Sequence, residues 1–160
     1  MLKIKIVAIG KIKERALSEL ICEYAKRLGR YCSLEIIEVA DESISARESG
    51  AGVIKLMRIE AERVLERLRP GAYYTIALDM GGTAMDSEAF AKNVGALSGA
   101  YPQIVFIIGG SHGLHPDVLA RSDFVFSMSE LTFPHQLARL VLLEQLYRAF
   151  KINSNETYHK

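Results

Sequence analysis

The chain has 160 residues, of which 49% are hydrophobic and 24% are charged, a balance typical of one folded domain. The formal net charge of +1 gives no overall basic signature of nucleic-acid binding. Two cysteines outside any C-x-x-C pair exclude a disulfide framework, and no apolar window approaches the roughly 18 residues of a membrane span. We therefore expect a single domain over residues 1–160, in the cytoplasm and without a membrane partner.

Strand-like and helix-like segments alternate along the chain. Strands are predicted where apolar residues alternate or run continuously, and helices where they recur every three or four positions. In chain order we predict strand 2–10, helix 14–28, strand 33–40, a helix from about 46 to 68, strand 73–80, helix 86–97, strand 103–110, a short helix within 115–122, strand 123–129 and helix 134–151. We expect "GGT" at 81–83 to end the third strand, and Asp86 or Ser87 to cap the next helix.

This alternation predicts an α/β fold with a mostly parallel sheet flanked by helices. The middle strands are near-continuous apolar runs, as expected where helices cover both faces of a sheet. Ligands of such sheets bind beyond the carboxyl ends of the strands. Those ends lie near Gly10, Leu78-Asp79 with Gly81-Gly82, Gly109-Gly110 and Met128-Ser129. Because glycine lets the backbone approach a ligand closely, the sequence predicts a cleft at this edge.

The last predicted helix is apolar around nearly its whole circumference. At about 100° per residue, its apolar side chains point in almost every direction: Leu137, Leu140, Val141, Leu142, Leu143, Leu146, Tyr147 and Phe150. A helix of this kind is covered on more than one side. A symmetric homodimer, in which the helix packs on its twin, supplies the second cover. A fully central helix in a monomer is the alternative.

The segment "GGSHG" at residues 109–113 supports an alternative function. It fits the G-x-S-x-G pattern of a nucleophile elbow, so a small α/β hydrolase using Ser111 is one alternative. Against it, residues 114–116 form another turn where an elbow needs a long helix. A second alternative is a non-catalytic dimeric module that binds RNA or a nucleotide, because glycines at several strand ends describe a cleft without identifying its ligand.

Two histidines, His112 and His115, form an H-x-x-H pair near Asp117. Structural and catalytic zinc sites use three or four protein ligands with a supporting shell of hydrogen bonds. A histidine pair in a turn does not reach that number. We therefore predict no metal ion.

The chain ends in Tyr158, His159 and Lys160. A tyrosine ring can stack on a nucleobase, and an imidazole moves protons near neutral pH. Arg148 and Lys151 shortly before the tail are cations that can contact phosphate. Composition alone favours a disordered tail, so the residue types leave its role open.

Four segments together resemble a known family. They are "IALDMGG", "VFIIGGSHGL", "FSMSELTFPHQLARLVLLEQLYRAFKI" and the terminal "NSNETYHK". They resemble the RlmH (YbeA-like) family of SPOUT-class methyltransferases, which methylate N3 of a pseudouridine in 23S rRNA. The similarity covers essentially the full length, and residues 103–160 are the most specific part.

The resemblance implies a homodimer whose C-terminal segment is threaded into a trefoil knot, a rare arrangement among folds. It also implies S-adenosylmethionine as the methyl donor, bound bent within the knot. Carried over by position, the donor site is Leu78, Gly109, Met128, Ser129, Glu130, Leu131, Thr132 and Phe133. In this family main-chain groups and apolar walls hold most of the adenine, so a phosphate-type glycine motif is not needed and Ser111 becomes a spacer.

The resemblance further assigns the catalytic residues to the end of the chain. His159 is the expected proton acceptor, because the imide nitrogen must lose its proton before it attacks a methyl group. Tyr158 is expected to stack on or orient the base, and Arg148 to hold a phosphate or polarise a base oxygen. With the knot and the dimer formed, we expect the tail to emerge from the last helix beside the donor loop at 128–133, and the sequence does not fix which subunit's tail serves which donor site. The expected substrate is an unstacked nucleotide of 23S rRNA in the assembled ribosome.

Overall fold

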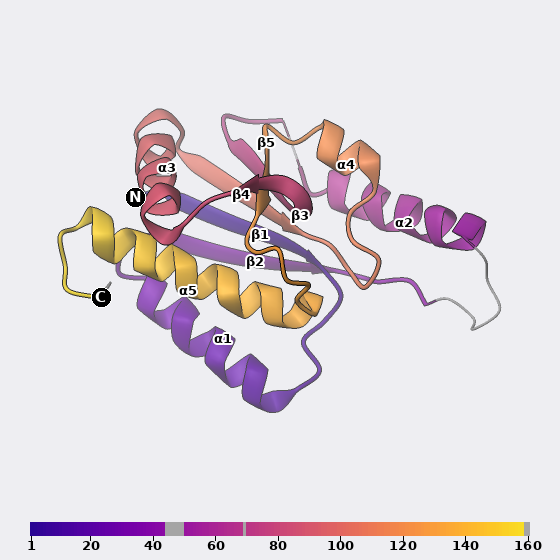
Figure 1. Cartoon of the computed structure of the whole chain (residues 1–160), viewed down its shortest axis with the longest axis horizontal. Coiled ribbons are helices and arrows are strands. Elements are labelled where there is room, and N and C mark those ends of the chain that lie inside the picture. Colours follow the sequence, from indigo (N-terminus) through magenta and orange to yellow (C-terminus); the bar gives the residue numbers. More distant parts are fainter. Residues whose placement is uncertain (44–49, 69, 159–160) are drawn as a thin grey trace.

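The computed structural model describes residues 1–43, 50–68 and 70–158, and Figure 1 shows the course of the chain. The elements are β1 (Lys3–Ile9), α1 (Arg15–Leu28), β2 (Ser33–Val39), α2 (Gly50–Leu65), β3 (Tyr74–Ala84), α3 (Ser87–Ala100), β4 (Gln103–Ile108), α4 (Pro116–Ala120), β5 (Phe124–Ser127) and α5 (His135–Asn153). The order and type of the predicted elements are confirmed. The first residues predicted for the second helix, 46–49, lie outside the described part.

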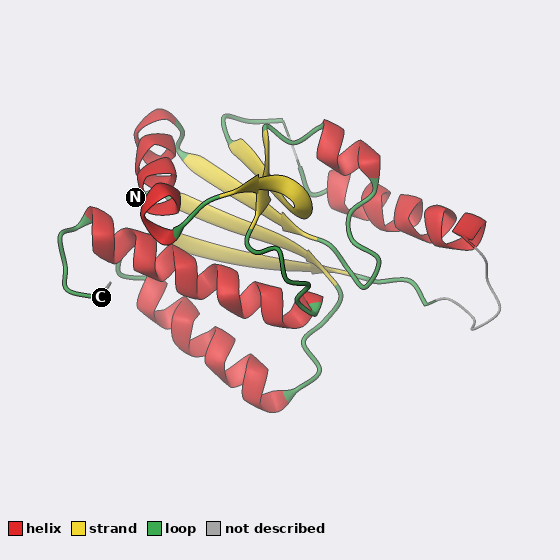
Figure 2. Cartoon of the chain, in the orientation of Figure 1, coloured by secondary structure: helices red, strands yellow, loops and turns green. Residues whose placement is uncertain are grey.

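The five strands form one parallel sheet in the order β2-β1-β4-β3-β5. Helices cover both faces of the sheet (Figure 2). Alternate residues of β1 divide between two cores: Ile4 and Ile6 pack with α1, α3 and α5, whereas Val7 and Ile9 pack with α2 and α4. This division follows from the two-residue period of a strand. The predicted α/β fold with helices on both faces is confirmed.

Strand β3 does not end where we predicted. Its assigned residues continue through the glycine pair to Ala84, and both Leu78 and Thr83 pair with Phe126 of β5. The residues 79–82 between them therefore form a bulge that leaves the ladder and rejoins it. A Cβ atom on Gly82 would lie 2.6 Å from the carbonyl oxygen of Val125. Glycine at this position lets the bulge lie against β5, so it permits the strand to continue instead of ending it.

Helix α5 packs on the sheet between α1 and α3 (Figure 1). Its buried face carries Leu142, Leu143, Leu146 and Ala149. On its outer face Leu137 keeps 38% of its surface exposed. One chain therefore covers most of the circumference of this apolar helix but leaves the first turn of its outer face open. The homodimer stays a prediction. Within the described part of the chain, no helix combines the length and apolar character of a membrane span.

Candidate active site

An open cavity of about 370 Å³ lies at the carboxyl ends of β4, β3 and β5. These ends meet at one edge of the sheet because the strands are parallel, and this edge is where open α/β sheets bind ligands. The lining residues come from three chain segments and the start of α5: Leu78, Asp79 and Met80; Ile108 to Gly113; Phe126 to Ser129; and Leu131, Thr132, Phe133, His135 and Ala138.

A tight glycine turn after β4 forms one wall of the cavity. The backbone N–H of Gly113 donates to the carbonyl oxygen of Gly110 at 3.1 Å. Gly113 has a φ of +79°, a value that side chains rarely permit. A Cβ atom on Gly109 would lie 2.6 Å from the carbonyl carbon of Gly113. Both ends of the turn therefore require glycine, and the turn brings backbone groups to the surface of the cavity.

Ser111 lies exposed at the tip of this turn. The next helix, α4, begins only at Pro116. Among the described residues, no hydrogen bond joins the hydroxyl of Ser111 to an imidazole or a carboxylate. The geometry therefore gives the hydrolase alternative no support. His115 is buried, and its Nδ1 accepts a hydrogen bond from the backbone N–H of Asp117 at 3.2 Å, so it caps α4.

The loop from β5 to α5 forms the opposite wall. The hydroxyl of Ser129 accepts a hydrogen bond from the backbone N–H of Leu131 at 2.9 Å, which fixes the turn of the loop. The hydroxyl of Thr132 donates to the sulfur of Met80 at 3.3 Å, which ties the loop to the β3 bulge. Met80 and Leu131 are 56% and 71% exposed. The mouth of the cavity thus has apolar side chains that lack cover.

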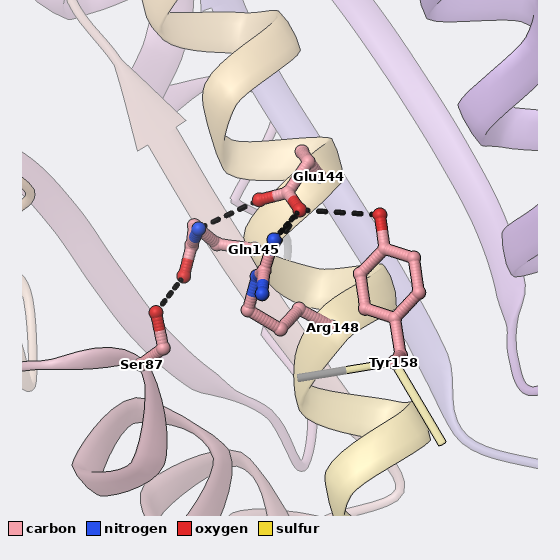
Figure 3. Close-up of polar contacts among 5 residues, drawn as sticks. All are labelled: Ser87, Glu144, Gln145, Arg148 and Tyr158. Atoms are coloured by element: carbon pink, nitrogen blue, oxygen red, sulfur yellow. Dashed lines mark hydrogen bonds and ion pairs between the residues drawn. The ribbon is translucent and has the colours of Figure 1, made fainter. Parts of the chain in front are cut away.

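A second polar cluster lies on the outer side of α5, around Glu144 (Figure 3). One carboxylate oxygen, Oε1, accepts hydrogen bonds from Nε of Arg148 at 3.1 Å, from its Nη2 at 2.6 Å, and from the hydroxyl of Tyr158 at 3.3 Å. The other, Oε2, accepts from Gln145 at 2.6 Å. Gln145 in turn accepts from Ser87 of α3 at 2.7 Å. The cluster therefore joins α3, α5 and the tail.

The surroundings of Tyr158 set its protonation state. Burial, hydrogen bonds to Tyr24 and Glu144, and the charge of Glu144 raise the pKa of Tyr158 to about 12. Tyr158 therefore remains a neutral phenol at physiological pH and can donate a hydrogen bond but cannot act as a base. The hydrogen bond to Glu144 also raises the pKa of Arg148, so this side chain remains a cation.

The tail is attached to the body of the chain through Glu156. Its carboxylate forms an ion pair with Lys151 of α5 and accepts a hydrogen bond from the hydroxyl of Tyr31 at 2.9 Å. The ring of Tyr158 then meets the ring of Tyr147 edge-on, with 5.1 Å between the ring centres. These contacts hold the tail against α5 and the turn after α1 as far as Tyr158. His159 and Lys160 lie outside the described residues.

A family model described as a predicted SPOUT methyltransferase matches residues 2–159. The chain belongs to the SPOUT methyltransferase family. It is similar to proteins named ribosomal RNA large subunit methyltransferase H from Acetivibrio thermocellus and Carboxydothermus hydrogenoformans, at 48% and 49% identity over 161 residues. Each comparison covers 99% of this chain and 100% of the relative. The resemblance to SPOUT methyltransferases is thus confirmed.

The fold has a counterpart among solved structures. A probable methylase family protein from Haemophilus influenzae Rd KW20 matches with a TM-score of 0.58 at 16% identity. The match covers 100% of this chain and 72% of that chain. At this identity the similarity concerns the fold alone. The threading of a SPOUT knot stays a prediction.

The structure brings together most of the residues that we predicted for the donor site. Those that line the cavity are Leu78, Gly109, Met128, Ser129, Leu131, Thr132 and Phe133. Glu130 is exposed and is not among the lining residues. The binding of a SPOUT methyl donor by these residues stays a prediction.

Sequence reasoning missed several residues of the cavity. His135 and Ala138 belong to the first turn of α5, and Met80 belongs to the β3 bulge. Asp79, also in the bulge, was predicted at this edge of the sheet but not as a donor-site residue. His135 follows closely after the predicted donor-site residues 128–133 in the sequence. This closeness was the signal that could have identified His135 as a residue of the cavity. Nothing in the sequence pattern indicated the bulge, because we read its glycines as the end of a strand.

Within one chain, the tail does not emerge beside the donor loop, and its place beside the donor loop of a partner stays a prediction. The loop leads into the first turn of α5, whereas the tail leaves the last turn of this 19-residue helix, roughly 28 Å further along its axis. The tail then turns back, and Tyr158 reaches Glu144. Glu144 is still six residues, or about 9 Å along the axis, beyond Ala138 of the cavity. Within one chain, the cavity is therefore separate from the polar cluster around Glu144, which we call the tail cluster.

Proposed function

We propose that the chain is a methyltransferase that uses S-adenosylmethionine to methylate N3 of a pseudouridine in a stem-loop of 23S rRNA, acting on the assembled ribosome. The observation that carries the proposal is the cavity. It is lined by the residues that the SPOUT resemblance assigns to the methyl donor. Membership of the SPOUT family and the full-length relatives named as ribosomal RNA large subunit methyltransferases support the reaction and the substrate class.

The cavity suits an adenosyl group in size and chemistry. Its volume of about 370 Å³ falls in the range of small-molecule sites. Leu78, Ile108 and Phe126 supply apolar walls for a flat ring. The glycine turn at 109–113 presents backbone N–H and C=O groups for hydrogen bonds with a ligand. A side chain at Gly109 would collide with the backbone of Gly113 and displace this turn. These features fit the donor, whose role is to supply an electrophilic methyl group on a positively charged sulfur.

The protein has two tasks in this reaction. It aligns the attacking nitrogen with the methyl group for an in-line displacement, and it removes the proton that N3 carries. A positioned base at this step contributes typically a factor of about 10² to 10⁴ in rate. We propose His159 as this base. Because the pKa of Tyr158 is raised to about 12, we assign its ring to stacking on or orienting the base. Arg148 supplies a cation for phosphate or a base oxygen.

A homodimer reconciles the two separate sites. Because the tail cluster of one chain lies away from its own cavity, we propose that the tail of one copy completes the cavity of the other. The exposed Leu137 and half-buried Val141 on the outer face of α5 then become part of an interface between two copies. The assembled ribosome as substrate fits the small net charge of +1, because contacts with the ribosome then contribute to recognition of the target.

Two measurements on the same preparation test the proposal. Titration calorimetry with S-adenosylmethionine tests the cavity, and methyl incorporation into ribosomes that lack the modification tests the reaction. We expect one donor molecule to bind per functional cavity and 23S rRNA to be labelled. Absence of donor binding would remove the proposal. Binding of donor and RNA without turnover would favour the non-catalytic module instead.

A further inference from the structure

Two histidines, His112 and His135, line the cavity, and His135 lies close to the end of β1. In the sheet order, β1 lies beside β4 and away from β3 and β5. The apolar walls from Leu78 and Phe126 belong to β3 and β5, whereas His112 lies on the turn after β4 and His135 lies at the start of α5. The two histidines therefore offer polar contacts beside the apolar walls of the cavity.

His135 and Asp41, which follows β2, both approach the backbone of Gly10 at the end of β1. A Cβ atom on Gly10 would lie 3.2 Å from Nε2 of His135 and 3.7 Å from Cγ of Asp41. Both side chains therefore pack against the same bare backbone position, which has a φ of +89° and so favours glycine. A second acid, Glu60, is buried next to the glycine turn after β4. Its Oε2 lies 3.6 Å from the position that a Cβ atom on Gly110 would take.

Arg139 fixes this arrangement. It is only 2% exposed, and its guanidinium forms an ion pair with Glu38 of β2. Its Nη2 also donates to the carbonyl oxygen of Gly10 at 2.9 Å. The first turns of α5 are thereby clamped to the ends of β1 and β2, and His135, one turn before Arg139, is placed beside Asp41. A group held in this way is preorganised to bind a ligand.

The surroundings keep His135 neutral. Burial is the main cause that lowers its pKa, and the nearby charges of Arg139 and Lys13 lower it further, whereas Asp41 opposes them. A neutral imidazole has one nitrogen that accepts a hydrogen bond. Beside it, the first turn of α5 presents backbone N–H groups that lack partners within the helix and attract negative charge. His135 and Asp41 therefore offer a hydrogen-bond acceptor and a carboxylate to a cation. The first turn of α5 offers N–H donors to an anion.

The methyl donor of the proposed reaction has one end with this pair of charges: its amino-acid end carries an ammonium and a carboxylate group. We propose that His135 and Asp41 form the subsite for the amino-acid end of the donor, with His135 accepting a hydrogen bond from the ammonium group and the first turn of α5 facing the carboxylate. This assignment rests on the proposed function. It gives His135 a binding role that is separate from proton removal at the substrate nitrogen.

The test compares two ligands that share the adenosyl group. S-adenosylhomocysteine carries the amino-acid end, and 5′-methylthioadenosine lacks it. We expect His135→Leu and Asp41→Asn each to weaken the binding of S-adenosylhomocysteine to the full-length protein by about ten- to a hundredfold, the effect of removing a hydrogen bond or charge partner from an ionised group. The affinity for 5′-methylthioadenosine should change less than threefold. Calorimetry measures both affinities without RNA or turnover.

The control variant is Glu62→Gln, which removes one negative charge from the exposed side of α2 and should leave both affinities unchanged. In wild type we expect the affinity for S-adenosylhomocysteine to fall on acidification as His135 becomes protonated, and His135→Leu should remove that dependence. Equal losses for the two ligands, or no loss for either, would overturn the proposal. If wild type binds neither ligand, the proposed function itself fails, so the two failures are distinguishable.

Discussion

The guanidinium of Arg148 lies 4.9 Å above the centre of the Tyr158 ring, and both side chains donate to the same carboxylate oxygen of Glu144. The cation covers one face of the ring, and the edge-on contact with Tyr147 fixes its orientation. The last described residue of the chain is thus held as a neutral, oriented ring. In this geometry Tyr158 offers the reaction an oriented ring and a neutral hydroxyl.

We predict that Tyr158→Phe retains most of the activity, whereas Tyr158→Ala loses about 1–3 kcal/mol of RNA binding, the contribution of one base stacked on an aromatic ring. Because the pKa of Tyr158 is raised to about 12, its hydroxyl does not titrate between pH 7 and 10. The pH–rate profiles of wild type and Tyr158→Phe should therefore have the same shape over this range. A basic limb present in wild type and absent from the Phe variant would contradict this account.

The glycine turn gives a prediction about the donor cavity. In Gly109→Ala the new methyl group would meet the backbone of Gly113 at 2.6 Å, so the turn must shift, at a cost of about 1–3 kcal/mol for an overpacked site. Donor binding measured by calorimetry should be lost or strongly weakened. The matched control is Gly99→Ala in α3, where a Cβ atom meets nothing within 4 Å.

That control should change the free energy of unfolding by less than about 1 kcal/mol, because Gly99 is the last but one residue of α3 and the full gain of alanine over glycine applies to the middle of a helix. It should leave donor binding unchanged. A Gly109→Ala variant that binds the donor as wild type does would show that the backbone of this turn is not part of the donor site.

These positions show how far the sequence alone reaches. The periodicity of apolar residues was sufficient for the sheet and its helices, because the two cores of β1 follow from simple alternation. The glycine pair at 81–82 was misread, since local propensity cannot show that Val125 approaches closely enough to require a bare backbone. His135 was missed because its partner Asp41 is distant in the sequence. The fold of the tail onto Glu144 depends on contacts between distant segments that no local pattern records.

Glu60 gives a prediction about stability and pH. Burial, the largest cause, raises its pKa and Asp41 adds to this, whereas the backbone N–H of Glu42 and the charges of His112 and Arg63 oppose it. The folded protein therefore holds this proton to a higher pH than the unfolded chain does. The stabilising contribution is complete below the unfolded pKa of a carboxyl group and is lost as pH rises through the folded pKa.

Glu60→Gln removes this titration while keeping an oxygen that can accept the N–H of Glu42. We expect the stability of the variant, relative to wild type, to increase between pH 4.5 and pH 7.5. Urea denaturation at the two pH values measures the difference. A relative stability that decreases over this range would mean that the carboxylate of Glu60 is stabilised in its charged form.

The separation between the cavity and the tail predicts the effect of a deletion. Removal of residues 155–160 takes away Tyr158 and His159 and leaves every residue that lines the cavity in place. We expect donor affinity and the oligomeric state to be unchanged and methylation to be abolished. The single variant His159→Ala should lower the methylation rate at saturating donor and RNA by a factor of about 10² to 10⁴. An unchanged rate would remove the proposed base.

The central claim is tested most directly by locating the transferred methyl group. Ribosomes that lack the modification are incubated with the wild-type chain and methyl-labelled S-adenosylmethionine, and the label is mapped to a nucleotide and an atom. The account predicts a single labelled position, N3 of a pseudouridine in a stem-loop of 23S rRNA. Label on another atom or another RNA, or no label from a preparation that binds the donor, would contradict it.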